Sequence, residues 1–414
     1  MLALSDHAFD EGELSEADEV IQPSSLRDYT WPKEDPSLFP QPVRQADDDD
    51  LTLILEAATA ATLDADSLTK STRDLDIARK VHFVLTHRKF QINPVSELRS
   101  EELWVTRIRE FVDRGEPIRI VYPLMCKIGS WAKQMTNVGP TAGELATILF
   151  FRHLNRVVQD IYEPGLRIAV VSDAMLYNSA FSNPQVEVAT YMSLVRSQIA
   201  TYASDFIDFY DYVDLLTECS DEYTALHHKY QRLMCESPGS VLSDVRRKTL
   251  FESVKASINV RKFGMSYADM RDLFSADINR SNRHWDIIDT MTRLAMEELV
   301  AIRKACMDLN YFERRWPGHV RVSCHKDRKG GRWVIGLRPY PEYYGSSKLL
   351  PYHGVPLVHR DSKDRIKMDV VPEVMLRGRT SLTRVESHDG EVYFYDGSDR
   401  YDPTLLSHDY EQSA

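Results

Sequence analysis

The residues best suited to chemistry lie at the ends of short apolar segments. The segment 319–325 alternates strictly between polar and apolar residues, as a strand does when only one face is buried. Its polar face carries Arg321, Ser323 and His325. A guanidinium can bind a carboxylate or phosphate, a hydroxyl adds a neutral contact, and an imidazole can move a proton near neutral pH. This face could line a ligand site or lie in water, and spacing alone leaves both open.

Four further residues could act with that face. Lys127 follows another apolar segment, where a lysine can pair with a phosphate, act as an amine nucleophile or be exposed to solvent. Ser172 and Asp173 end a third apolar segment, where an aspartate could act on a ligand or cap the next turn. His353 lies in a turn before a strand, which would present its imidazole, although a lone histidine in a turn is usually just exposed.

A strand, a helix and a second strand are predicted around these residues. Residues 118–122 form a β-branched and aromatic run that ends at a proline, and residues 166–171 form a second apolar run. Between them, Thr141 and Glu144 fit a capping box that begins a helix, and a Pro-Gly pair ends it. Such a βαβ unit implies parallel strands joined by a right-handed crossover.

Parallel strands bring their carboxyl ends to one edge of the sheet, where open α/β sheets bind ligands. The residues after the two strands should therefore meet in one crevice. This places Lys127 near Ser172 and Asp173.

The rest of the chain predicts a largely helical middle and a mostly antiparallel β C-terminal section. Amphipathic helical spacing covers 186–216, 221–235, 242–256 and 281–309. Further on, segments 319–325 and 333–337 flank a Lys-Gly-Gly turn, which favours a hairpin, and short strands are expected at 355–359, 367–371 and 391–395. The fold class is therefore α/β, with a Rossmann-like parallel βαβ core.

The formal net charge of −12 comes almost entirely from the first fifty residues. These hold 14 Asp and Glu against 3 Lys and Arg, a net of −11, which leaves 49 acids and 48 bases for residues 51–414. With five prolines and no sustained apolar periodicity, residues 1–50 are predicted to be an acidic, disordered leader. Regular elements begin near residue 74, so we predict one catalytic domain over 74–400 and a tail over 401–414.

Several classes of protein are disfavoured by composition and motifs. The five cysteines are widely spaced without a Cys-x-x-Cys pair, which argues for reduced thiols rather than disulfides or a zinc knuckle. No long apolar run or secretory signal is visible, so we expect a cytoplasmic protein without a membrane partner. Zincin, dinucleotide, P-loop and α/β-hydrolase motifs are absent, and no basic stripe suggests a nucleic-acid partner.

Three motifs in order resemble the isocyanide (isonitrile) synthase family, also called pyoverdine/dityrosine biosynthesis proteins. They are Glu-Pro-Gly-Leu-Arg-Ile leading to Ser172-Asp173, then Pro-Gly-His-Val-Arg-Val-Ser-Cys-His over 317–325, then Pro-Tyr-His-Gly-Val over 351–355. The family has a similar Pro-Gly before a strand and Ser-Asp-Gly, a similar Arg-Leu-Ser-x-His and a similar Pro-Trp-His-Gly. The resemblance extends over about residues 75–395.

The resemblance implies a reaction. Family members convert the α-amino group of tyrosine or tryptophan to an isocyanide and take the carbon from the ketone of ribulose 5-phosphate, while some fungal relatives are associated with formylated tyrosine. Condensation, proton transfers and carbon–carbon cleavages would need anion anchors and acid/base groups, with no metal or redox cofactor required. An oxygenase dependent on iron and 2-oxoglutarate is a common pathway companion, so it is a possible partner beside the amino-acid and sugar-phosphate substrates.

The resemblance also implies a role for each candidate. Lys127 and Arg321 would hold anionic groups, with imine chemistry open to Lys127, and Asp173 and His325 would transfer protons. The positioning contacts would come from the remaining three residues, Ser172, Ser323 and His353.

The sequence departs from the family at the predicted crevice. Lys127 matches the family lysine only with a short insertion, Ala174 replaces a glycine, and Tyr352 replaces a tryptophan. Three hypotheses therefore stay open: an isocyanide synthase-like enzyme, a related condensing or carbon–nitrogen-forming enzyme on the same fold, and a non-catalytic binding or scaffold protein. The fold prediction is less affected by these changes than the reaction.

Overall fold

The computed structural model describes a large part of the chain. The described residues are 43–59, 72–87, 89–91, 101–123, 139–181, 185–257, 283–324, 335–337, 354–360, 364–371, 373–376, 379, 381–386 and 393–397. The segment 1–42 of the predicted leader and the predicted tail 401–414 lie outside them.

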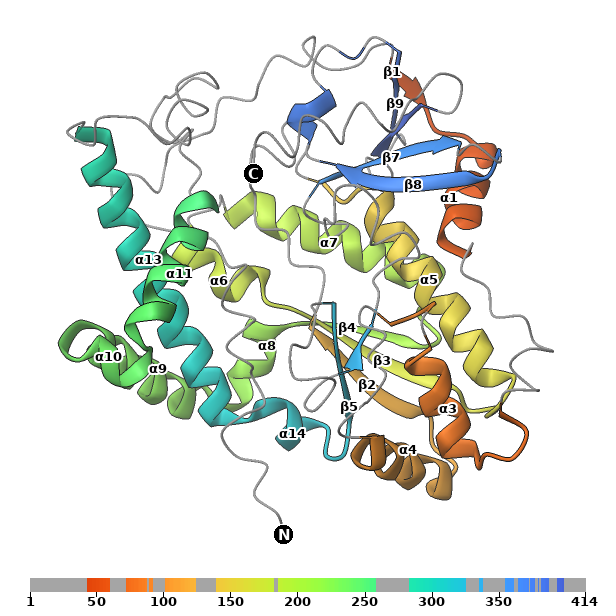
Figure 1. The fold of residues 1–414 in the computed structure, drawn as a ribbon, viewed down its shortest axis with the longest axis horizontal. Coiled ribbons are helices and arrows are strands. Elements are labelled where there is room, and N and C mark those ends of the chain that lie inside the picture. The colour runs from red at the N-terminus through yellow and green to blue at the C-terminus, as the bar shows by residue number, and fades with distance from the viewer. Residues whose placement is uncertain are drawn as a thin grey trace.

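A five-stranded parallel sheet forms the centre of the fold (Figure 1). Its order is β4-β3-β2-β5-β6, and the strands are β2 (Ile118–Pro123), β3 (Leu166–Ser172), β4 (Ile207–Asp211), β5 (Val320–Ser323) and β6 (Ile335–Gly336). Strands β2 and β3 pair in parallel along their length, from Ile118 beside Leu166 to Pro123 beside Val171. The predicted βαβ unit and the α/β fold class are therefore confirmed.

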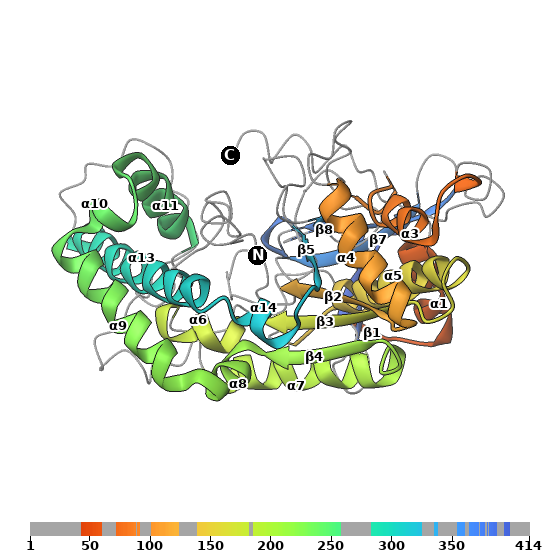
Figure 2. The same cartoon turned by 90° about the horizontal axis from the view of Figure 1, so that it is seen from below.

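Helices cover both faces of the central sheet (Figure 2). One face packs on α3 (Ile77–Leu85), α4 (Glu101–Arg114), α5 (Ala142–Gln159) and α7 (Gln185–Tyr202). The other packs on α6 (Ala174–Phe181), α8 (Tyr212–Leu216), α9 (Ser220–Glu236), α11 (Asp244–Ser257), α13 (Arg283–Leu309) and α14 (Tyr311–Arg315). Helix α10 (Pro238–Val241) and the 3-10 turn η4 (Thr217–Cys219) join neighbouring helices. We call these two sides the α5 face and the α13 face.

Helix α5 begins at the predicted capping box. The Thr141 side chain accepts a hydrogen bond from the Gly143 amide at 3.1 Å, and the Glu144 carboxylate accepts one from the Thr141 amide at 2.6 Å. Nearly the whole helix is buried because it lies between two sheets. Ile148 and Phe151 pack on the central sheet, and Leu145 and Leu149 pack on a second sheet.

The helical middle contains one strand that the sequence analysis missed. A helix was predicted over 186–216, but α7 ends at Tyr202 and the chain then forms β4 before α8. The β4 segment Ile-Asp-Phe-Tyr-Asp alternates in burial only weakly, because it lies at the edge of the sheet and pairs with β3 alone. A short edge strand between two helices without Gly or Pro around it gives little periodic signal.

The predicted hairpin over 319–337 is wrong. Strand β5 pairs in parallel with β2 on one side and with β6 on the other. The chain enters β5 from α13 and α14, so β5 belongs to the parallel sheet rather than to the C-terminal section. Alternation along 319–325 predicts a strand correctly but does not specify the direction of its partner.

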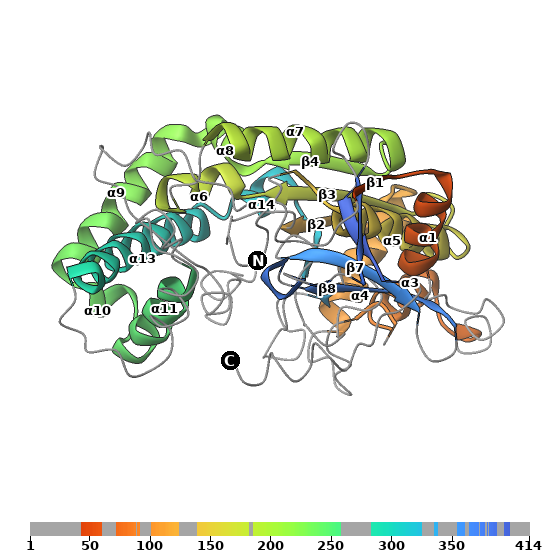
Figure 3. The ribbon, with the colours of Figure 1, turned by 90° about the horizontal axis from the view of Figure 1, so that it is seen from above.

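The second sheet is mixed and packs on the outer side of α5 (Figures 1 and 3). Its order is β1-β9-β10-β7-β8, and the strands are β1 (Val43–Gln45), β7 (Val355–Arg360), β8 (Ile366–Val371), β9 (Thr383–Glu386) and β10 (Tyr393–Asp396). The 3-10 turn η7 (Glu373–Leu376) follows β8. Pairs β7–β8 and β9–β10 are antiparallel, while β10–β7 and β1–β9 are parallel. Strands β7 and β8 confirm those predicted at 355–359 and 367–371, β10 confirms the described part of the one predicted at 391–395, and β9 was not predicted.

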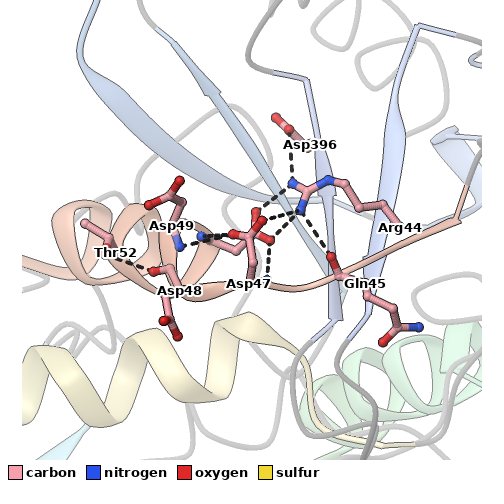
Figure 4. Close-up of polar contacts among 8 residues, drawn as sticks. Arg44, Gln45, Asp47, Asp48, Asp49, Thr52 and Asp396 are labelled. Atoms are coloured by element: carbon pink, nitrogen blue, oxygen red, sulfur yellow. Dashed lines mark hydrogen bonds and ion pairs between the residues drawn. The ribbon is translucent and has the colours of Figure 1, made fainter.

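Residues 43–50 are folded, which corrects the end of the predicted leader. Strand β1 pairs with β9, and α1 (Asp48–Thr59) begins inside the run of four aspartates. Figure 4 shows Arg44 beside this run, and its guanidinium donates to both oxygens of buried Asp50 at 2.5 and 2.6 Å. Aspartates in the first turn of a helix interact favourably with its dipole, so this acidic cluster stabilises a helix start instead of solvating a disordered chain.

Two further expectations can be compared with the described residues. Their four cysteines, Cys219, Cys235, Cys306 and Cys324, are free thiols. None of the helices there is long and apolar enough to cross a membrane.

Candidate active site

Polar side chains follow β3, β4 and β5 at the carboxyl edge of the central sheet. Ser172 ends β3 and lies beside Asp211, the last residue of β4, with Asp173 directly after it. On the far side of β2, Arg321 lies beside Val121, and Ser323 ends β5. The edge predicted to bind ligands therefore collects a serine and an acid from β3, a second acid from β4, and a cation and a serine from β5.

Ser172 and Asp173 face opposite sides of the sheet, as strand alternation requires. The Ser172 hydroxyl lies 3.1 Å from the Met192 sulfur of α7, on the α5 face, and accepts a hydrogen bond from the Ala174 amide at 3.3 Å. The Asp173 carbonyl accepts from the Tyr177 amide at 3.0 Å, and the Asp173 charge adds to the increase that burial causes in the pKa of Tyr177 and of Cys306, which both belong to the core of the α13 face. Of the two, Asp173 is thus the one directed toward the α13 face.

Arg321 also points to the α13 face. Its side chain is buried, and its guanidinium carbon lies 5.5 Å from the ring centroid of Phe312. Phe312 in turn stacks on Tyr212 with ring centroids 5.1 Å apart, and the Arg321 charge opposes the strong increase that burial causes in the pKa of Tyr212. Because Tyr177, next to Asp173 in the first turn of α6, belongs to the same core, Arg321 and Asp173 reach one cluster from two strands.

That cluster contains four residues that the sequence analysis did not name. Tyr177 comes from α6, Tyr212 from α8, and Arg303 and Cys306 from α13. Helices α6, α8 and α13 lie by the carboxyl ends of β3 and β4 (Figure 2). Helical spacing could have indicated that Cys306 faces inward, but only the folded chain shows that α13 passes over this edge.

Asp211 is the other acid at this edge, and its environment differs from that of an exposed carboxylate. Its pKa is raised to about 6, mainly by burial, with a smaller increase from the nearby Asp214 and Asp173 and an opposing effect of the Val213 amide. That amide donates to Asp211 at 2.9 Å, so the residue caps α8. A carboxyl group with such a pKa can both take up and release a proton near neutral pH.

The seven predicted site residues fall into two groups. Ser172, Asp173, Arg321 and Ser323 lie at the carboxyl edge as expected, with Ser172 turned to the α5 face. Lys127, His325 and His353 lie outside the described residues, so the proximity of Lys127 to Ser172 and Asp173 stays a prediction. The chemical roles of all seven also stay predictions. Within the described part of the chain, no group of three or more His, Cys, Asp or Glu gathers as metal ligands would.

The first half of the 317–325 motif lies at the opposite, amino edge of the sheet. Gly318 adopts a left-handed conformation with φ of 73°, and its amide donates to Glu313 at 3.0 Å. The carbonyl of His319 accepts a hydrogen bond from Arg107 at 2.6 Å, and its Nδ1 donates to the carbonyl of Trp316 at 2.9 Å. Burial lowers the pKa of His319 to about 4, so it is neutral near pH 7 and fixes the entry of the chain into β5.

The comparison with protein families agrees with the motifs. The family model described as pyoverdine/dityrosine biosynthesis protein matches residues 108–371, which is more than half of the chain. The chain belongs to this family. The matched region includes β2, β3, β4 and β5 and therefore the whole carboxyl edge described above.

Characterised relatives are distant. An L-tryptophan isonitrile synthase from Fischerella ambigua is 22% identical over 114 residues, covering 28% of this chain and 34% of the relative. An L-tyrosine isonitrile synthase from Pseudomonas aeruginosa is 22% identical over 152 residues, covering 37% and 46%. One from Xenorhabdus nematophila is 22% identical over 270 residues, covering 64% and 74%. The chain thus spans less than half the length of the first two relatives and about three quarters of the third.

The fold matches that of a solved family member. The crystal structure of PvcA from Pseudomonas aeruginosa superposes with a TM-score of 0.55 at 17% identity, covering 78% of this chain and 99% of PvcA. At this identity the likeness concerns the fold alone. It agrees with the α/β fold described above.

Proposed function

We propose that this protein is an isonitrile synthase-like enzyme that converts the α-amino group of a tyrosine- or tryptophan-like amino acid to an isocyanide. Ribulose 5-phosphate would donate the carbon from its ketone. The observation that carries the proposal is the position of Asp173 and Arg321 at the carboxyl edge of the parallel sheet, beside one aromatic core on the α13 face and inside the family-matched region. The isonitrile synthase names of the relatives support the reaction class.

The side chains at this edge are suited to the steps of the proposed reaction. The amine must condense with the ketone, protons must move, and carbon–carbon bonds must break. Arg321 offers a guanidinium to a carboxylate or phosphate, and Asp173 and Asp211 are carboxyl groups at the ends of neighbouring strands. Lys127 and His325 would add an amine and an imidazole by their family positions, and Ser172, Ser323 and His353 would position the substrates.

The test is a labelled product assay. The protein is incubated with ribulose 5-phosphate carrying ¹³C at its ketone carbon and with a panel of amino acids, and products are followed by mass spectrometry. We expect the label in an isocyanide of one aromatic amino acid. Unchanged amino acids across the panel, with a chain shown to be folded, would contradict the proposal.

The assay also distinguishes the alternatives. A labelled N-formyl amino acid would favour a related carbon–nitrogen-forming enzyme on the same fold. Stabilisation by a different sugar phosphate in a thermal-shift screen would favour another carbon donor, because a ligand that binds only the native state raises its stability. Partner capture that requires residues 1–50, without any turnover, would favour a scaffold.

A further inference from the structure

Arg303 lies on the inward-facing stripe of α13. It follows Leu299 by four residues and precedes Cys306 by three, so the three side chains share one face of the helix. Leu299 and Cys306 are buried in the core of the α13 face, while Arg303 is half-buried. A guanidinium at such a position loses part of its hydration. Charged side chains are seldom found there without specific polar interactions.

Tyr177 holds Arg303 in place. The Arg303 Nε donates to the Tyr177 hydroxyl oxygen at 3.4 Å, and the guanidinium carbon lies 5.5 Å from the Tyr177 ring centroid. Burial raises the pKa of Tyr177 far above its ordinary value, so its hydroxyl stays protonated. Because the hydroxyl oxygen accepts from Arg303, its own hydrogen points away from the guanidinium.

Tyr177 links Arg303 to Asp173. The Tyr177 amide donates to the Asp173 carbonyl at 3.0 Å, so the first turn of α6 joins Asp173 to the residue that contacts Arg303. Arg321 contacts the same core, with its guanidinium carbon 5.5 Å from the ring centroid of Phe312. Two guanidiniums therefore contact aromatic residues of one core, one from α13 and one from β5.

We propose that Arg303 is a second anion-binding residue of the candidate active site, and that Tyr177 is its positioning residue. The inference rests on the proposed function in one respect, namely that an amino acid and a sugar phosphate bind together. These substrates carry two anionic groups, a carboxylate and a phosphate, and a partly desolvated site needs a cation for each. Arg303 binds one group and Arg321 binds the other.

The experiment measures binding of each anion separately. Calorimetric titrations use ribulose 5-phosphate, inorganic phosphate and an aromatic amino acid with the full-length protein and its Arg303→Gln variant. We expect the variant to lose about tenfold or more in affinity for either the phosphate ligands or the amino acid, with little change for the other class. Loss for the phosphate ligands assigns the phosphate to Arg303, and loss for the amino acid assigns the carboxylate.

Two variants separate this role from a structural one. Arg293→Gln removes an exposed guanidinium from the same helix, where it pairs with Glu297 at 3.2 Å, and should bind both ligand classes like the wild type. Tyr177→Phe removes the hydroxyl that accepts from Arg303, and should weaken binding of the same ligand class as Arg303→Gln by a smaller factor. A general packing defect would instead lower the melting temperature and weaken both classes equally.

The outcomes also separate this inference from the proposed reaction. Wild-type affinity of Arg303→Gln for every ligand overturns the role of Arg303, whatever the protein catalyses. Binding of both classes and their selective loss, without product formation, keeps the anion site and overturns the reaction. If the wild type binds neither class, both proposals fall. If the glutamine variant does not fold, Arg303→Met replaces it, because methionine keeps an unbranched side chain and removes the charge, and wild-type affinity of that variant overturns the inference.

Discussion

The two ends of β5 use neighbouring residues for different purposes. At the amino edge, Gly318 and His319 are held by backbone carbonyls, Glu313 and Arg107, and the histidine is neutral. At the carboxyl edge, Arg321 contacts Phe312, which stacks on Tyr212 in the same core as the first turn of α6 after Asp173. The polar groups at the amino edge are thus hydrogen-bonded within the protein, whereas the carboxyl edge brings an acid and cations together.

This difference separates structural from chemical residues within one family motif. The Pro-Gly-His part of 317–325 directs the chain into the sheet, and the Arg-Val-Ser part supplies side chains to the candidate active site. Substitutions at the amino edge should therefore change stability, and substitutions at the carboxyl edge should change turnover. The opposite result in any of the following experiments would contradict this distinction between a structural amino edge and a chemical carboxyl edge.

The largest effect is expected at Asp173. Asp173→Asn keeps the shape of the side chain and removes its ability to take up a proton. We expect product formation to fall roughly 10²–10⁴-fold, the usual contribution of a general acid or base. The measurement is kcat/KM in the labelled assay, together with the melting temperature, which should hardly change.

A matched control for this variant lies at the same edge. Asp214→Asn removes an exposed carboxylate from α8, which lies 3.8 Å from the guanidinium of Arg196. It should leave kcat/KM within about twofold of the wild type, because solvent-exposed ion pairs contribute little. Equal losses in both variants would show that charge at the edge matters rather than Asp173 itself.

The next effect is the pH dependence of stability from His319. Its pKa is about 6.5 in an unfolded chain and about 4 in the fold. Between these values the unfolded state binds more protons, so the free energy of unfolding falls as pH decreases from about 6.5 to 4, by roughly 3 kcal/mol. Urea denaturation of the wild type and of His319→Asn across this range gives the effect as a difference.

The wild type must be compared with the His319→Asn variant because titration of Asp211 changes stability in the opposite direction. Its pKa is raised from 3.8 to about 6, so between these values the folded state binds more protons and stability increases as pH falls. The asparagine variant keeps Asp211 and can still donate to the Trp316 carbonyl. If the two proteins lose stability in parallel below pH 6.5, His319 is not the group responsible.

Local signals explain which parts of the fold were predictable. The capping box of Thr141 and Glu144 and the apolar runs of β2 and β3 are contained within a few residues each, so the βαβ unit could be derived from the sequence. The place of β5 beside β2 depends on a pairing of Val320 with Ile120, two hundred residues away, which alternation does not encode. The same limitation produced the wrong hairpin.

The residues of the candidate active site also differ in whether local sequence signals could predict them. Asp173 and Arg321 were predictable because they end or interrupt strands at an edge that βαβ topology assigns to ligands. Tyr177 and Arg303 were not, since they lie on helices whose residues reach that edge only through packing of α6 and α13. The aspartates before α1 were misjudged because a charge run in a sequence does not show whether a helix starts within it.

The smallest effect tests whether the two ends of β5 are independent. Gly318 and Gly115 both have left-handed backbones, with φ of 73° and 68°, so alanine at either should cost about 1–2 kcal/mol of stability. A Cβ at Gly318 would also approach a Glu110 oxygen to 3.1 Å, whereas one at Gly115 would meet nothing within 4 Å. We expect Gly318→Ala to be slightly less stable than Gly115→Ala in urea, because the Glu110 side chain can move, while kcat stays unchanged in both. A selective loss of kcat in Gly318→Ala would mean that the entry turn positions Arg321 through His319 and Val320, and the amino edge would then belong to the catalytic machinery.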